Sequence, residues 1–61
     1  MNEKEIIEKI KAHRIDYGLT QKEASEKMGY ISNRFYHFEK GHIRITLELL
    51  NRMREVFGWE F

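Results

Sequence analysis

Side chains that can bind phosphate or hydrogen-bond to nucleobases gather in one part of the chain, residues 30–44. With its histidines neutral, this segment has a formal charge of +2, and its charged and titratable residues are Arg34, His37, Glu39, Lys40, His42 and Arg44. Residues 1–29 balance to zero, and residues 45–61 carry −1. A local basic excess is the expected footprint of phosphate contact.

Two short predicted helices, residues 21–28 and 32–40, would carry most of these side chains. Thr20 followed by Glu23 has the spacing of a capping box, which begins the first helix. The second helix is expected to begin with Ser32 as its N-cap. A glycine follows each of them, and glycine adopts the left-handed conformation that ends helices. Such a pair of helices is the unit that many proteins place in the DNA major groove.

The second of these helices has two distinct faces. Projected at about 100° per residue, Phe35 and Phe38 mark its buried side. The opposite side is polar and would face solvent or a ligand; its members are Asn33, Tyr36, His37 and Lys40. The candidate binding side chains therefore share one surface.

The remaining sequence predicts two further helices, residues 3–17 and 47–57. The four glycines each follow a helical pattern, so the fold class is expected to be all-α, a compact bundle of four to five short helices. Thr46 is the expected N-cap of the last helix, whose core face is assigned to Leu47, Leu50, Met53 and Phe57.

Arg14 and Glu39 are the charged residues that need a partner. Arg14 lies at the edge of the apolar face of the first helix, and Glu39 leans toward Phe38. A charge turned inward is costly unless it is paired. An Arg14–Glu39 ion pair between two helices is one solution, and two separate exposed charges are the other.

Composition excludes several other classes of protein. Sixty-one residues form a single domain, 1–61, which leaves little room for a substrate pocket, and no catalytic motif is present. The chain has no cysteine, which fits the reducing cytoplasm, and no apolar run that predicts a membrane span. Its three histidines have no i,i+4 pairing. We therefore expect no enzyme activity, metal, cofactor or small-molecule ligand.

The spacing of Arg14, Gly18-Leu19-Thr20-Gln21, Glu23, Gly29, Glu39 and Gly41 resembles the phage-repressor (Cro-like, lambda-repressor-like, XRE) helix-turn-helix family. The string Thr46-Leu47-Glu48 with Leu50 also fits, so the resemblance covers residues 6–59. It implies a lambda-repressor-like DNA-binding domain in which Arg14 and Glu39 form a structural ion pair.

The resemblance also implies roles in binding double-stranded DNA. The positions that read base edges are Ser32, Asn33 and His37, and Arg34 joins them if it turns inward. The expected phosphate contacts are Gln21, Lys22, Tyr36, Lys40, His42 and Arg44.

The chain departs from the family at two places near this surface. Family members commonly have Ser or Thr at the position of Ile31, whereas here the hydroxyl comes one residue later. They usually have Leu-Ala where this chain has Ala24-Ser25. We expect the two large Phe side chains of the third helix to refill the volume lost at Ala24.

A homodimer on two half-sites is expected, because one recognition helix covers about half an operator. The candidate interface residues are Leu49, Trp59 and Phe61. The alternative is that Trp59 and Phe61 fold back onto Ile6 and Ile10 as a lid on the core. The sequence therefore predicts a sequence-specific transcriptional regulator, repressor-like and bacterial or phage in type. The alternative is a protein-interaction module, such as an antitoxin-like partner or an adaptor with the same fold.

Overall fold

The computed structural model describes residues 2–61 and contains four helices: α1 (Glu3–Asp16), α2 (Gln21–Lys27), α3 (Arg34–Lys40) and α4 (Leu47–Phe57). No strand occurs in this part of the chain. The all-α prediction is confirmed, and no fifth helix forms, because residues 58–61 are irregular.

Each helix begins where a polar side chain accepts a hydrogen bond from a backbone N–H of the first turn. Thr20 and Glu23 form the predicted capping box, and Thr46 caps α4 as expected. The hydrogen bond that the Glu23 carboxylate accepts from the backbone N–H of Thr20 (2.9 Å) holds the pKa of that carboxyl below its ordinary value, and the neighbouring Thr20 hydroxyl lowers the pKa further. The N-cap of α3 is Asn33 and not Ser32, one residue later than predicted, and the first residue of the helix is Arg34.

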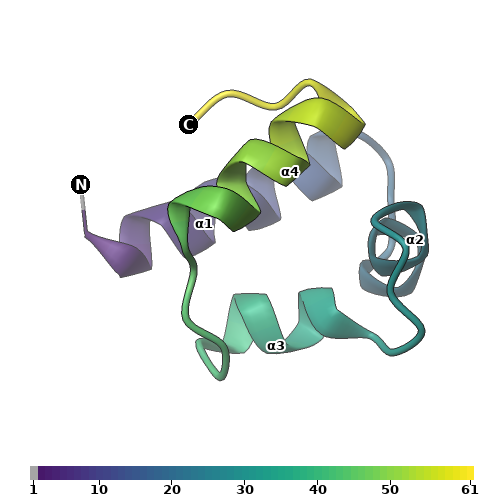
Figure 1. The fold of residues 1–61 in the computed structure, drawn as a ribbon, viewed down its shortest axis with the longest axis horizontal. Coiled ribbons are helices and arrows are strands. Elements are labelled where there is room, and N and C mark those ends of the chain that lie inside the picture. Colours follow the sequence, from purple (N-terminus) through teal and green to yellow (C-terminus); the bar gives the residue numbers. More distant parts are fainter. Residues whose placement is uncertain (1) are drawn as a thin grey trace.

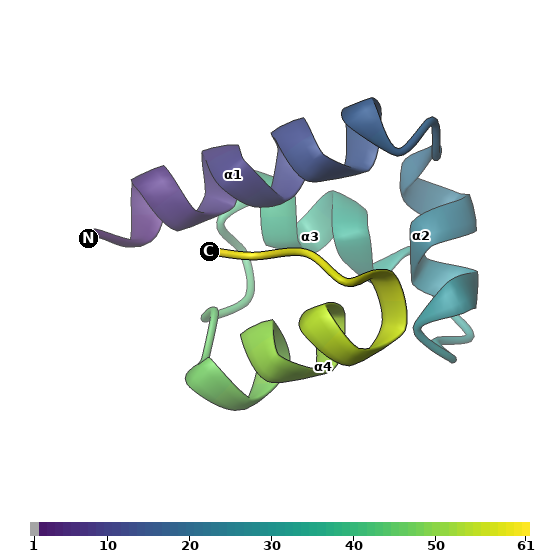
Figure 2. The ribbon, with the colours of Figure 1, turned by 90° about the horizontal axis from the view of Figure 1, so that it is seen from above.

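The helices enclose one core between two layers. Figures 1 and 2 show α1 and α4 running beside each other above α3, with α2 closing one end. The C-terminal segment, residues 58–61, crosses the side of α1 and α4 that faces away from α3. The surface of α3 is therefore on the opposite side of the molecule from the C-terminus.

Aromatic rings fill the middle of this core. Phe35 and Phe38 are buried, and their rings meet edge-on with centroids 5.3 Å apart. Trp59 is 4% exposed and stacks on Phe57 at 4.2 Å. The other fully enclosed apolar side chains are Ile10, Ala24, Met28 and Met53. Ala24 and Phe35 thus belong to the same buried cluster.

The burial of two leucines of α4 differs from what the sequence predicted. Leu47, predicted for the core, is 74% exposed, whereas Leu49, predicted for the dimer interface, packs against the core. At about 100° per residue, Leu49 lies about 40° from Met53 around the helix and Leu47 about 120°. The buried stripe of α4 therefore runs through Leu49 and Met53.

The aromatic residues at the C-terminus also serve the chain's own core. Trp59 stacks on the His13 ring at 5.5 Å, and Phe61 meets the same ring edge-on at 5.4 Å. His13 Nε2 lies 2.8 Å from the carbonyl oxygen of Glu60, which fixes the segment against α1. The Trp59 ring is thus covered within the monomer, as the lid alternative predicted, and little of it is left for a dimer interface.

Ser25 is the buried polar residue that joins α2 to α3. Its hydroxyl donates to the carbonyl oxygen of Gln21 (2.9 Å) and accepts from the backbone N–H of Phe35 (2.9 Å). The N–H of Phe35 lies in the first turn of α3 and has no partner within that helix. The serine therefore satisfies a buried donor that an alanine would leave unpaired.

We predict that Ser25→Ala lowers the free energy of unfolding by about 1–3 kcal/mol, the usual cost of a buried donor without a partner. Urea denaturation followed by circular dichroism measures the change. Ser32→Ala is the matched control, and we expect it to change stability by less than about 0.5 kcal/mol because Ser32 is exposed. Equal stability of Ser25→Ala and the parent would contradict the assigned hydrogen bond.

Candidate nucleic-acid interface

The outward face of α3 carries the polar side chains that the sequence placed there. Phe35 and Phe38 point into the core, and Tyr36, His37 and Lys40 are exposed. The helix lies on the side of the molecule opposite the C-terminal segment (Figure 1). This face is open to a large ligand.

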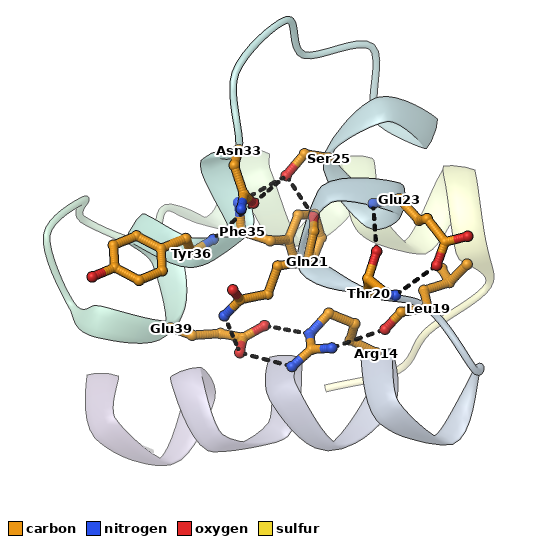
Figure 3. A network of polar contacts seen from close by, with 10 residues as sticks. All are labelled: Arg14, Leu19, Thr20, Gln21, Glu23, Ser25, Asn33, Phe35, Tyr36 and Glu39. Carbon is orange, nitrogen blue, oxygen red and sulfur yellow. Dashed lines mark hydrogen bonds and ion pairs between the residues drawn. The ribbon is translucent and has the colours of Figure 1, made fainter.

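An ion pair between α1 and α3 holds the inner edge of this helix (Figure 3). Arg14 Nε donates to Glu39 Oε2 at 2.7 Å, and a terminal nitrogen of Arg14 donates to Oε1 at 3.1 Å. Arg14 also donates to the carbonyl oxygen of Leu19 (2.8 Å), and Gln21 Nε2 donates to Glu39 Oε1 (3.0 Å). The side chains of Arg14 and Glu39 are 12% and 6% exposed. The predicted ion pair is therefore present, and it links α1, α2 and α3.

The ion pair changes the electrostatics of the outer face. Glu39 is the one acidic residue in residues 30–44, and its carboxylate is turned inward and neutralised by Arg14. The charged side chains that remain at the surface of this segment are basic, namely Arg34, Lys40 and Arg44. The exposed part of α3 and of the following loop therefore carries charge of one sign, positive.

The first residues of α3 are arranged differently from the prediction. Ser32 is exposed and lies before the helix. Asn33 Oδ1 accepts from the N–H of Tyr36 at 3.4 Å and lies 3.4 Å from the hydroxyl oxygen of Ser25 (Figure 3). A two-bond contact between asparagine and adenine needs that oxygen as an acceptor. Asn33 must therefore release its cap in order to make such a contact.

Four residues at the C-terminal end of α3 form a surface group that we name the α3 cluster: Tyr36, His37, Lys40 and His42. The Tyr36 ring meets the rings of His37 (5.3 Å) and His42 (6.2 Å), and Lys40 Nζ lies 5.8 Å from its centre. Nδ1 of His37 and Nδ1 of His42 are 3.2 Å apart. Aromatic contacts thus hold two titratable rings and one ammonium group together.

Gly41 is the reason that His37 and His42 meet. It adopts a left-handed conformation, with φ of +76°, which ends α3 and turns the chain. The backbone N–H of His42 then donates to the carbonyl oxygen of His37 at 2.9 Å. Sequence reasoning missed this contact because residues five apart diverge on a continuing helix.

The other candidate residues lie around the edge of this surface. The guanidinium of Arg34 lies over the Tyr30 ring, 5.0 Å from its centre, so it leans toward the turn that precedes α3. Lys22 is exposed on α2, and Arg44 is exposed in the loop after α3. Gln21 uses one N–H of its amide on Glu39 and has a second to offer.

Comparisons with protein-family models, with curated proteins and with solved structures found no match. Among residues 2–61, no helix is both long and apolar enough to cross a membrane. The same residues contain no group of three or more His, Cys, Asp or Glu side chains arranged to hold a metal ion. The arrangement of side chains on α3 is therefore the evidence from which a function is argued.

We predict that Arg14→Met destabilises the chain by about 3–5 kcal/mol, because it leaves the buried Glu39 carboxylate unpaired. The double variant Arg14→Met/Glu39→Met should lose less than the sum of the two single variants, since no charge is then left unpaired. A chain of this length has only about 3–9 kcal/mol of stability, so a loss of this size leaves little folded protein in buffer. The stability of the variants is therefore measured by refolding them with the osmolyte TMAO.

Arg54→Met is the matched control, because Arg54 is exposed on α4. It should change the TMAO midpoint only slightly, by less than about 0.5 kcal/mol. Strict additivity of the Arg14 and Glu39 substitutions would contradict a direct coupling between the two side chains.

Proposed function

We propose that this chain is a helix-turn-helix protein that binds double-stranded DNA in a sequence-specific manner and regulates transcription as a homodimer. The observation that carries the proposal is the positive charge of the exposed α3 face, from which the single acidic residue of residues 30–44 is withdrawn into an ion pair. Lysine and arginine side chains that neutralise phosphates supply most of the non-specific affinity for DNA.

In this proposal α3 enters the major groove with its exposed side toward the bases. A seven-residue helix is about 10 Å long, so it contacts a few base pairs. His37 lies on that side, and its Nδ1 atom is occupied by His42. The other ring nitrogen of His37, Nε2, is therefore the atom that meets a base edge, and the state of His42 sets whether it donates or accepts.

The remaining basic and polar residues would contact the backbone. Lys40 and Arg44 follow the exposed face of α3, and Lys22 and Gln21 lie on α2 beside it. Arg34 leans toward Tyr30 and away from the axis of α3, which favours a phosphate over a base. These contacts would position the helix, while His37 would contribute to the choice of sequence.

Dimerisation follows from the size of the contact. One copy of α3 covers a single half-site, and two copies would lie on half-sites about 34 Å apart. The monomer core already uses Trp59, and it covers parts of Leu49 and Phe61. A symmetric footprint on an inverted repeat is the expected signature of the dimer.

We predict that Lys40→Ala weakens binding to all DNA duplexes alike and reduces the salt slope by about one unit, because one phosphate contact is lost. His37→Ala should instead reduce the preference for the chosen site over scrambled DNA by about tenfold, in line with the loss of a base contact. Selection from a random duplex pool supplies the site, and fluorescence anisotropy at several salt concentrations measures both quantities.

Lys9→Ala is the control for a loss of charge elsewhere. Lys9 lies beside Glu60, on the side of α1 that faces the C-terminal segment. It should leave both affinity and salt slope unchanged. Equal losses on all sequences for His37→Ala and Lys40→Ala would defeat the assignment of His37 to a base.

One observation favours a second function, a protein-interaction module. Ile31 is fully exposed in the turn between α2 and α3, and Leu47 is largely exposed at the start of α4. Apolar side chains left uncovered can mark protein contacts. Absence of DNA binding even at low salt, with no sequence enriched by the selection, would support this alternative.

A further inference from the structure

The contact between His37 and His42 places two metal-ligating nitrogens side by side. Their Nδ1 atoms are 3.2 Å apart, and both residues are exposed. Two imidazole nitrogens on one tetrahedral Zn²⁺ ion, each bound at about 2.05 Å, lie about 3.3 Å from each other. The observed separation is thus close to the one that a shared metal ion requires.

The backbone holds the two rings in this position. Gly41 turns the chain through its left-handed conformation, and the hydrogen bond from His42 N–H to the His37 carbonyl closes the turn. The Tyr36 ring borders both imidazoles. The two imidazole rings are therefore already restricted before any ion binds, which lowers the entropic cost of forming a chelate.

The orientation of the rings requires only a small adjustment. Their centroids are 5.4 Å apart and their planes are inclined by 42°. The 3.2 Å separation of the two Nδ1 atoms is that of a hydrogen bond, in which one Nδ1 donates and the other accepts. A change of tautomer that places the proton of each ring on Nε2, together with a rotation of each ring, would direct both Nδ1 lone pairs to one point.

We propose that His37 and His42 form a bidentate site for a divalent transition-metal ion that favours imidazole, such as Zn²⁺, Ni²⁺ or Cu²⁺. The ion would be bound through both Nδ1 atoms, and water would complete its coordination. Imidazole is a preferred ligand of these ions. Lys40, which belongs to the same cluster, lowers the affinity through its charge.

The proposal differs from the expectation drawn from the sequence, which found no metal site. That expectation rested on helical i,i+4 spacing, whereas Gly41 ends α3 before His42. It is also independent of DNA binding, and its test uses the metal ion and the protein alone. If α3 also binds DNA, a bound ion would occupy the Nδ1 atoms of His37 and His42, whose contact orients the Nε2 atom of His37.

The test is a titration of the full chain with Zn²⁺, followed by calorimetry and by NMR of the histidine ring nitrogens. We expect one ion per chain, with the ring signals of His37 and His42 shifting together and those of His13 unchanged. His37→Ala and His42→Ala should each lower the affinity at least tenfold, because either change removes the chelate. Lys40→Ala should raise the affinity.

His13→Gln is the matched control, since it removes a histidine on the opposite side of the molecule and should keep the parent affinity. Circular dichroism confirms that each variant is folded, as expected for the exposed His37 and His42. Absence of binding at millimolar Zn²⁺ would overturn the proposal. So would retention of the parent affinity in both single variants, because it would mean that the histidines bind separately.

Discussion

The position of α3 depends on the pairing of two charges inside a very small protein. Arg14 and Glu39 are largely removed from water, and either one alone would be a heavy cost for a domain of this size. Their geometry uses both carboxylate oxygens and three donor groups, so the pair is well satisfied. Gln21 adds a fourth donor from α2. One polar contact thus sets the spacing of three helices.

The same contact shapes the surface on the other side of α3. A glutamate in a basic segment would reduce the attraction of that segment for an anion if it faced solvent. Here its charge is compensated within the protein, and Arg34, Lys40 and Arg44 are left at the surface. Stability and surface charge are therefore coupled, because the inward turn of Glu39 contributes to both.

The features predicted correctly from the sequence are those with a local signal. The helices, the capping box at Thr20 and the split of α3 between buried phenylalanines and exposed polar side chains follow from spacing alone. The Arg14–Glu39 pair was one of two alternatives that the helical faces left open, and the resemblance to the helix-turn-helix family favoured it. In each case short-range chemistry and tertiary structure agree.

The features that were missed depend on contacts between distant segments. Asn33 and not Ser32 caps α3, and the first turn of that helix is fixed from α2 by the Ser25 hydroxyl, which accepts from the N–H of Phe35. Leu47 and Leu49 are the same residue type, and only the packing of α4 on the core distinguishes them. The His37–His42 contact depends on the backbone turn at Gly41, which helical projection does not represent.

The chain contains a single tryptophan, and its place at the edge of the core has a practical consequence. Trp59 is enclosed between Phe57 and His13, and the segment that carries it is fixed to α1 through the Glu60 carbonyl. Release of this segment would expose the indole to water and shift its emission to longer wavelength. The protein thus has an intrinsic optical reporter at the junction between its last four residues and the rest of the fold. Its ring also meets Phe35 of α3 edge-on, with centroids 6.2 Å apart, so the reporter is linked through the core to the helix of the candidate interface.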